Sequence, residues 1–329
     1  MISLIKREWY TIAIFGMVVL AWFLPISGEP AHAFSIGTKA AVTLLFFLHG
    51  ARLSRDVVLA GMIHWRLHLF VLATTFVIFP ILGLIVIALP SLASSAIGTG
   101  ILFLCVLPST VQSSIAFTSI AGGNVPAAIC SASASNILGM FLTPLLVGLL
   151  FQTQGGNGIS LDAVESILLQ LLAPFLLGQL VQPLISQWLG RHKVLTQIVD
   201  RGSILMVVYG AFSEATISGL WHTLSVGDLA AIVAIDVVLL AVVLCFTYFV
   251  SGWLRFNRED RIAITFCGSK KSLASGAPMA SVIFAGQNIG LIVLPLMLFH
   301  QIQLMACAIL ARRFASNSRE MDRKLVEAR

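Results

Sequence analysis

The fold is decided by a polar stretch inside an apolar segment, Leu107-Pro108-Ser109-Thr110-Val111-Gln112-Ser113-Ser114. The surrounding segment, residues 97–121, is long enough to cross the hydrocarbon core of a bilayer as one helix, which takes about 20 residues. Proline lacks a backbone donor and clashes with the preceding turn, so a helix bends or stops there. The sequence therefore predicts a membrane-spanning helix that is interrupted part-way across.

A second interruption lies at the matching place in the second half of the chain, Gly268-Ser269-Lys270-Lys271-Ser272, inside the apolar segment 260–285. Related motifs end the two segments 164 residues apart, Ile120-Ala121-Gly122-Gly123-Asn124 and Phe284-Ala285-Gly286-Gln287-Asn288. Ordinary helix kinks at Pro108 and Gly268 are the alternative. Two interruptions at equivalent positions favour breaks at a binding site, because freed backbone groups persist at membrane depth only where they line a cavity or are buried in protein.

Hydropathy along the chain predicts ten membrane-spanning helices. Charged residues make up 10% of the 329 residues, against about 25% in soluble domains, and the mean hydropathy is +0.98. This composition excludes a large soluble domain and indicates an all-α, multi-pass membrane protein. Ten spans in two similar halves give five per half, an odd number, so we expect the two repeats to be inverted. The predicted spans are residues 9–25, 36–50, 66–89, 97–121, 125–151, 165–185, 200–218, 228–252, 260–285 and 288–312.

Lysine and arginine are distributed unevenly between the two sides of the predicted bundle. Of the 20, 17 lie near the termini or in loops on the same side, and the opposite loops contain none. The positive-inside rule therefore places both termini in the cytoplasm. The 17 residues are Lys6, Arg7, Arg52, Arg55, Arg66, Arg191, Lys193, Arg201, Arg255, Arg258, Arg261, Arg312, Arg313, Arg319, Arg323, Lys324 and Arg329.

Several motifs resemble those of the bile acid:sodium symporter-like superfamily, and the likeness covers essentially the whole chain. It is greatest to the branch that contains solute carrier family 10 member 7 and its bacterial homologues. The motifs are Ala121-Gly122-Gly123-Asn124-Val125-Pro126, Ser131-Ala132-Ser133-Ala134-Ser135-Asn136, Thr143-Pro144 and Phe266-Cys267-Gly268-Ser269-Lys270-Lys271-Ser272-Leu273-Ala274.

The resemblance implies two domains, with the discontinuous fourth and ninth helices crossing near the membrane midplane. It also implies alternating access, in which a core domain moves against a panel domain. The panel domain would comprise residues 1–65 and 152–225, and the core domain residues 66–151 and 226–312. A cytoplasmic tail, residues 313–329, would follow.

The resemblance fails at the sodium site. In sodium-coupled members, the break in the ninth helix carries a glutamate and a following glutamine–asparagine pair that help to ligate sodium. Here Phe266 lies near the glutamate position, and Lys270 and Lys271 lie near the amide pair. A cation site needs oxygen ligands and negative charge. We therefore expect no sodium coupling of the usual family kind, although Asn136, Gln112 and Ser114 retain some oxygen ligands.

The two lysines have two interpretations, because a lysine at the bilayer centre costs about 2.5–3.5 kcal/mol on insertion scales. Either both side chains reach back to the cytoplasmic interface, or one fixed charge replaces sodium while the other faces an anionic substrate. A proton is another candidate coupling ion. Burial and a neighbouring like charge favour the neutral amine, so a lysine here could bind and release a proton. We expect Lys271 in the polar pocket with Asn136, and Lys270 nearer a cytoplasmic vestibule.

The predicted binding site extends from the two interruptions to neighbouring spans. Asp236 is the first candidate counter-charge for the lysines, whereas Glu214 lies toward the outer end of its span and is expected to be hydrated. His300 and Gln301 are candidates for substrate contacts or for hydrogen bonds between helices. The predicted substrate- or ion-binding residues are Gln112, Ser113, Ser114, Ser133, Asn136, Asp236, Ser269, Lys270, Lys271, Ser272 and His300.

The favoured function is secondary transport of a small organic anion or a related solute by alternating access. Paired interruptions support it, and no G-x-x-x-x-G-K-[ST] motif for ATP occurs. The alternative is a regulatory membrane protein that keeps the fold without transport. We expect no enzyme, because intramembrane aspartyl chemistry needs two carboxylates and Asp236 has no acidic mate in the predicted spans.

The remaining expectations concern partners and location. The five cysteines all lie in apolar runs, so we expect neither a disulfide nor a metal site, and no cofactor. Basic residues are not interleaved with aromatics in a stripe, which argues against nucleic acid. We expect a small, anionic solute and membrane lipid as partners, in a bacterial inner membrane.

Overall fold

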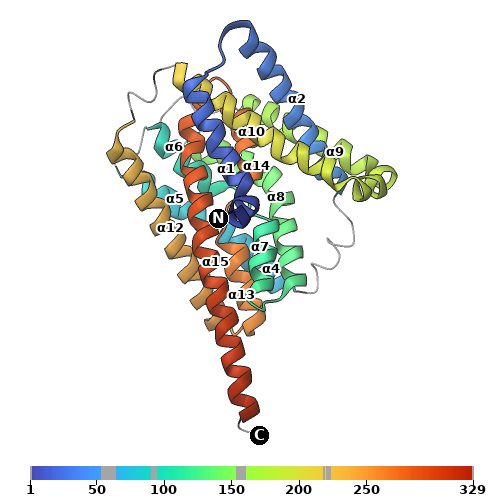
Figure 1. Ribbon diagram of the computed structural model, residues 1–329, viewed down its shortest axis with the longest axis vertical. Helices are drawn as coiled ribbons and strands as arrows, with labels where there is room; N and C mark the ends of the chain where they lie inside the picture. Colours follow the sequence, from blue (N-terminus) through green and yellow to red (C-terminus); the bar gives the residue numbers. More distant parts are fainter. Residues whose placement is uncertain are drawn as a thin grey trace.

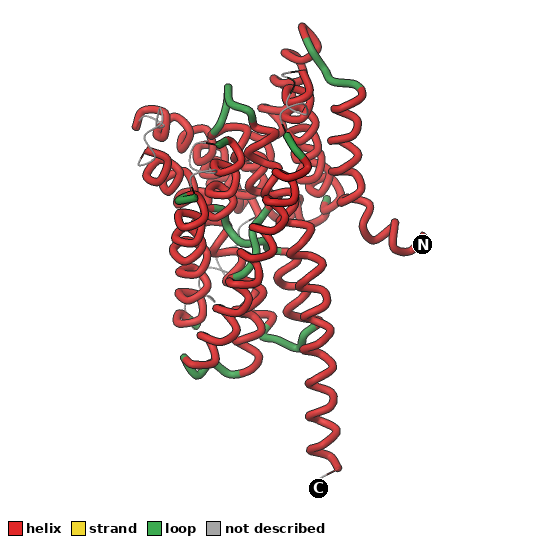
Figure 2. Tube along the Cα trace, turned by 90° about the vertical axis from the view of Figure 1, so that its left-hand side faces the viewer, coloured by secondary structure: helices red, strands yellow, loops and turns green. Residues whose placement is uncertain are grey.

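Figure 1 shows the computed structural model, which describes residues 2–52, 64–89, 95–152, 161–217, 219 and 224–327. This part of the chain consists of helices joined by short connections and contains no strand (Figure 2). The prediction of an all-α protein is therefore confirmed for the described residues. Of the residues that support the predicted orientation, Arg55 and Arg329 lie outside them.

Within these residues, six helical segments are long and apolar enough to cross a membrane. The chain is thus a multi-pass membrane protein, while the count of ten spans and their inverted arrangement stay predictions. The six segments are α2 (Gly28–Arg52), the run from α4 (Trp65–Ala73) through η1 (Thr74–Ile78) to α5 (Phe79–Ile87), α8 (Val125–Gln152), α10 (Lys193–Ile217), α12 (Val226–Trp253) and α15 (Ile289–Glu327).

Polar side chains cap several helices and explain where they begin. Ser95 accepts from the third backbone N–H of α6 (Ala96–Val106), and Asn257 does the same for α13 (Arg258–Gly268). Ser225 forms a reciprocal capping box with Asp228 at the start of α12. Ser272 caps α14 (Leu273–Ile283), so this helix starts directly after the two lysines.

Four helices form a first group: α1 (Ile2–Phe23), α2, α9 (Leu161–Arg191) and α10. Here α2 packs along α9, and α10 packs against both α1 and α2 (Figure 1). Gly50 and Gly178 allow α2 and α9 to touch. A Cβ added to Gly50 would lie 2.0 Å from the carbonyl oxygen of Phe175, and one added to Gly178 would lie 2.0 Å from that of Phe47.

The other helices form a second group around α15, which runs through the length of the molecule (Figures 1 and 2). Helices α6 and α12 pack against α15, and α13 packs against α12. The predicted tail continues α15 as a helix up to Glu327 and projects beyond the rest of the bundle. The second group holds both predicted interruptions.

Both interruptions are breaks and not kinks. Helix α6 ends at Val106 and α7 (Gln112–Ile120) begins six residues later, while α13 ends at Gly268 and α14 begins at Leu273. The structure adds a third irregularity that sequence analysis missed. The segment from α4 to α5 contains the π-helix η1, which ends two residues before Pro80.

Candidate functional site

The two helix breaks lie against each other and bond directly. Each break leaves backbone groups without their helical hydrogen-bond partners. Several of these groups are hydrogen-bonded across the contact, between the first break with α7 and the second break with α13. Three of the hydrogen bonds between these segments run from Ser272 N–H to Pro108 O (2.9 Å), from Ser109 Oγ to Cys267 O (2.5 Å) and from Ser114 Oγ to Phe266 O (3.0 Å).

Helix α8 supports the first break from one side. Asn136 donates from Nδ2 to the carbonyl of Ser109 (2.6 Å), and Ser135 Oγ accepts from the N–H of Ser109 (3.0 Å). The ring of Pro108 lies over Gly139, where an added Cβ would come within 2.6 Å of the proline Cβ. The hydroxyl-rich motif of α8 therefore satisfies unwound backbone, and its glycine makes room for it.

Helix α15 supports the second break through Gln303, a residue that sequence analysis did not select. Gln303 Oε1 accepts from the N–H of Lys271, and Gln303 Nε2 donates to the carbonyl of the same residue, both at 2.9 Å. The amide also lies 2.9 Å from His300 Nδ1. This bidentate pairing fixes the backbone from which the Lys271 side chain extends.

The Lys271 ammonium is fully buried and surrounded by backbone carbonyls. Its Nζ donates to Leu107 O (2.7 Å), Cys105 O (2.8 Å) and Thr75 O (2.9 Å), and lies 4.1 Å from the ring centroid of Phe79. The expectation that Lys271 shares a pocket with Asn136 is therefore wrong. Lys271 points to the end of α6, because the break turns its side chain away from α7.

Lys270 points the other way, toward α7. It is also fully buried, so the expected position in a hydrated vestibule is wrong as well. Its Nζ lies 4.2 Å from the ring centroid of Phe117, 5.5 Å from that of Phe266 and 3.5 Å from Ser113 Oγ. Both lysines are fully buried, which contradicts the interpretation that their side chains reach back to the interface.

Asp236 does not form the expected ion pair with either lysine. Among the described residues, the ion pairs within 4.0 Å are those of His49 and Arg52 with Asp200. Asp236 is fully buried in α12, and neither of its carboxylate oxygens has a hydrogen-bond partner there.

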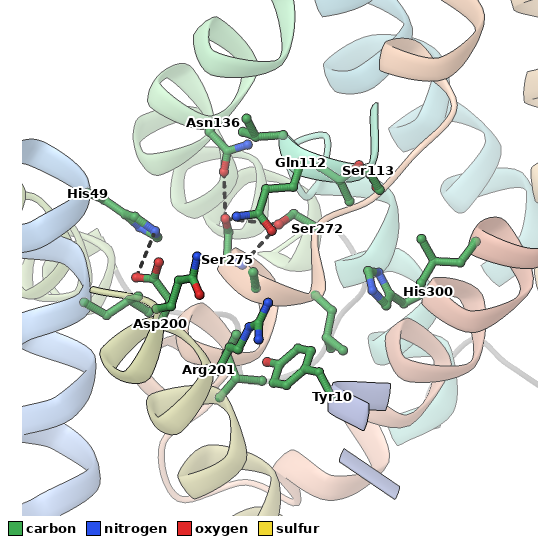
Figure 3. Close-up of a pocket in the computed structure, with 18 of the residues that line it drawn as sticks. Tyr10, His49, Gln112, Ser113, Asn136, Asp200, Arg201, Ser272, Ser275 and His300 are labelled. Atoms are coloured by element: carbon green, nitrogen blue, oxygen red, sulfur yellow. Dashed lines mark hydrogen bonds and ion pairs between the residues drawn. The ribbon is translucent and has the colours of Figure 1, made fainter. Parts of the chain in front are cut away.

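A cavity of about 410 Å³ opens between the first helix group and the two breaks (Figure 3). Residues at the N-termini of α7 and α14 lie on one wall, and residues of α1, α2 and α10 lie on the other. The polar residues that line it are Tyr10, His49, Arg52, Thr110, Gln112, Ser113, Asn136, Gln197, Asp200, Arg201, Ser272, Ser275 and His300.

The wall formed by the first group carries the charged residues. Arg52 Nη1 donates to Asp200 Oδ2 at 2.7 Å, and His49 Nε2 lies 3.9 Å from Asp200 Oδ1. The guanidinium of Arg201 lies over the ring of Tyr10, with its Cζ 5.4 Å from the centroid (Figure 3). Two arginines and one aspartate give this wall a net positive charge.

A second cavity, of about 870 Å³, lies between the same groups near the C-terminal end of α14. Lys39 and Glu214 are among its lining residues. On α2, Leu45 lines the first cavity and Val42 the second, and on α10 the corresponding residues are Ile204 and Val207. All four are buried, so about one helical turn of apolar side chains separates the cavities on each helix.

Comparison with known families matches nearly the whole chain to one model. The SBF-like CPA transporter family matches residues 8–316. The chain belongs to this family. Transport of a small molecule is thus its family function, which favours a transporter over an enzyme.

Relatives from bacteria and animals are similar over almost their full length. An uncharacterized protein of Pseudomonas aeruginosa is 54% identical over 320 residues, covering 97% of this chain and 96% of the relative. The Escherichia coli protein YfeH, which is named as a putative symporter, is 52% identical over 314 residues, covering 95% of this chain and 94% of the relative. Sodium/bile acid cotransporter 7-B of Xenopus laevis is 31% identical over 314 residues, covering 93% of this chain and 91% of the relative. The branch indicated by the motifs is therefore confirmed.

The sodium chemistry implied by the wider superfamily does not fit the residues at this break. Phe266 supplies no side-chain oxygen, and the carbonyls at the end of α6 already accept hydrogen bonds from Lys271. A sodium ion beside this ammonium would meet like charge and occupied ligands.

The structure brings only part of the predicted site together. Gln112, Ser113, Asn136, Ser272 and His300 line the first cavity. The others lie behind its wall or apart from it: Ser114, Ser133, Ser269, Lys270, Lys271 and Asp236.

The wall formed by α1, α2 and α10 holds none of the predicted site residues. Arg52 and Arg201 counted only as topology signals, because they lie at the predicted cytoplasmic ends of their helices. The neighbouring Asp200 was a usable signal, since an acid beside a base at a helix end suggests a specific pairing. Its partner, however, is 148 residues away.

Proposed function

We propose that the protein is a secondary transporter that moves a small organic anion by alternating access. The observation that carries this proposal is the first cavity, into which the N-termini of both half-helices α7 and α14 open. Half-helix N-termini carry the positive end of the helix dipole and donate unpaired N–H groups. Transporters use such ends to bind anionic groups of their substrates near the membrane midplane.

The charged residues at and behind the cavity wall have a net positive charge, which favours binding of an anion. Arg52 and Arg201 face it from the first helix group, and only Asp200 opposes them there. Behind the opposite wall, the Lys270 ammonium contacts Ser113, which itself lines the cavity. The volume of about 410 Å³ suits a small solute.

The two cavities support alternating access. They lie between the same helix groups and are separated by a thin apolar layer on α2 and α10. A rigid-body movement of one group along the other would open the second cavity to the site and close the first. In this proposal the first group is the panel domain and the second is the core domain, in an inverted repeat of five spans each.

Transport is proposed to be independent of sodium, and a proton is the candidate coupling ion. The lysines supply fixed positive charge at the break, and Asp236 is a buried carboxyl without a bonding partner among the described residues. The positive-inside distribution supports termini in the cytoplasm and a bacterial inner membrane.

The test begins with ligand binding to the purified protein. Carboxylates, sulfonates and phosphate esters of small organic compounds are screened for an increase in melting temperature, and positive compounds are tested for counterflow in proteoliposomes. We expect at least one anion to stabilise the wild type and to be exchanged. Arg52→Gln and Arg201→Gln should each weaken its binding about tenfold or more, because each removes a charge from the wall.

Arg191→Gln is the matched control, because Arg191 ends α9 as an exposed residue outside the cavity lining. It should leave binding unchanged. Stabilisation by cations or neutral solutes alone would refute the anionic substrate. Anion binding without counterflow would favour the regulatory alternative over transport.

A further inference from the structure

The carbonyls around the Lys271 ammonium are all free of helical partners. Cys105 and Leu107 lie at the C-terminal end of α6, and the N–H of Ser109, which would bond Cys105 in a continued helix, donates to Ser135 Oγ instead. Carbonyls at a helix C-terminus carry the negative end of the dipole. Two of the three oxygens therefore form an electronegative group that attracts a cation.

The third carbonyl is freed by the π-helix. In η1 the N–H of Phe79 bonds Thr74 O, five residues back, instead of Thr75 O. The next residue, Pro80, has no N–H with which to continue this pattern. Thr75 O is left unpaired by the helix and accepts from Lys271 Nζ at 2.9 Å. The third irregularity of the fold thus completes a set of oxygens from α4–η1–α5 and α6.

The ammonium matches this set in number and charge. Three acceptors at 2.7–2.9 Å use all three N–H donors of an ammonium, whereas a neutral amine has only two. The face of the Phe79 ring, 4.1 Å away, adds a cation–π contact. No carboxylate of the described residues lies within 4.0 Å of Nζ, so neutral oxygens and a ring stabilise the charge.

Unwound carbonyls and half-helix C-termini are the groups with which broken-helix transporters hold a coupling cation. Carbonyl oxygens replace the hydration shell of a monovalent ion in the same way. We infer that the three-carbonyl group is a monovalent cation site whose resident cation is the tethered ammonium of Lys271. The site takes a small primary ammonium or an alkali cation once that side chain is removed.

Lys270 provides an internal contrast. It is equally buried and adjacent in sequence, yet its ammonium lies over Phe117 and Phe266 with one distant hydroxyl. Aromatic faces and a single hydroxyl offer a free cation no oxygen cage. The inference therefore predicts a cation response for substitutions of Lys271 and none for the same substitutions of Lys270.

The cation site rests on the proposed sodium independence. Its test measures stability and not transport, so the cation site and the proposed function can be refuted separately. Lys271→Ala removes three methylenes and the ammonium, which n-propylammonium replaces in size and charge. Melting temperatures of the purified wild type, Lys271→Ala and Lys270→Ala are measured in chlorides of n-propylammonium, sodium, potassium and tetramethylammonium at equal ionic strength.

We expect Lys271→Ala to melt well below the wild type and to regain stability with n-propylammonium or an alkali cation. The recovery should be saturable, roughly 4–8 °C at a hundredfold excess over Kd. Tetramethylammonium carries the charge without N–H donors and should have no effect. The wild type and Lys270→Ala should show no specific response to any of these cations.

Absence of a saturable, cation-specific rise in Lys271→Ala would overturn the inference, as would an equal rise in Lys270→Ala. If Lys271→Ala does not fold, the nearly isosteric pair Lys271→Met and Lys270→Met decides. The thioether fills the space of either side chain but donates nothing. Lys271→Met should then melt far lower than Lys270→Met, and equal melting temperatures would contradict a tethered cation.

Discussion

The backbone N–H of Ser272 donates a hydrogen bond of 2.9 Å to the carbonyl of Pro108 and so joins the two helix breaks. Each residue belongs to a different half of the chain, and neither group has a helical partner of its own. Because the bond is between main-chain atoms, it does not depend on the side chain at position 272, provided that the residue is not proline. The two breaks are therefore parts of one rigid unit, and the substrate wall that they form is set by both halves together.

Gly139→Ala should destabilise the protein. The new Cβ would lie 2.6 Å from Cβ of Pro108, in a buried contact where neither helix α8 nor the break can easily give way. The expected cost is about 1–3 kcal/mol, measured as a lower melting temperature. Gly190→Ala is the control, because no atom lies within 4 Å of its added Cβ. It should keep or slightly raise the melting temperature, and equal losses for both variants would contradict the close contact.

Gln303→Leu should destabilise the second break. The substitution leaves the buried N–H and C=O of Lys271 without partners, at a cost of about 2–4 kcal/mol. Gln301→Leu, two residues away on the same helix, is the matched control and should cost less than about 1 kcal/mol. Chemical denaturation of the two variants checks this difference. Similar midpoints would show that the bidentate amide contributes little.

The breaks could be predicted because their signals are local. Pro108 and the polar residues after it are visible in the sequence, and so is the hydroxyl-rich run that contains Ser135 and Asn136. The directions of Lys270 and Lys271 could not be predicted, since both lie between α13 and α14, where helical geometry does not relate neighbouring side chains. The role of Gln303 also depends on tertiary packing, because a polar residue in an apolar helix has many possible partners.

The pairing of Arg52 with Asp200 escaped prediction for a different reason. The residues lie on α2 and α10, and their meeting depends on how the first helix group packs. The π-helix was missed because Pro80 alone predicts a kink and not the register shift that precedes it. For the ion pair the missing information is the relative placement of two distant helices, and for the π-helix it is the local backbone register.

Replacing sodium with potassium at constant ionic strength should leave transport unchanged. The carbonyls of Cys105 and Leu107 are occupied by the Lys271 ammonium, so the wild type offers no free sodium ligands there. Substrate-dependent melting temperature and initial uptake rates in proteoliposomes check the prediction. A saturable sodium requirement of the wild type would show that a different site binds the ion.

Arginine substitutions should separate the two lysines. A guanidinium is larger and planar, and it cannot direct three donors to one point as an ammonium does. Lys271→Arg should therefore lower stability by about 1–3 kcal/mol through overpacking. Lys270→Arg should be tolerated, because a guanidinium stacks well on the rings of Phe117 and Phe266. Melting temperatures of both variants provide the test, and the opposite ranking would reverse the assignment of their roles.

Asp236→Asn should leave the protein folded and remove the pH dependence of transport. An ionised carboxylate buried without hydrogen-bond or charge partners is unfavourable, so a neutral amide of the same shape should not lower the melting temperature. An amide cannot exchange a proton, and if Asp236 carries the coupling proton, the uptake rate should no longer vary between about pH 5.5 and 8.

Asp228→Asn is the control on the same helix: Asp228 is exposed and forms a capping box with Ser225. It should alter stability slightly while keeping the pH profile of the wild type. An unchanged pH profile in Asp236→Asn would remove Asp236 from the coupling mechanism.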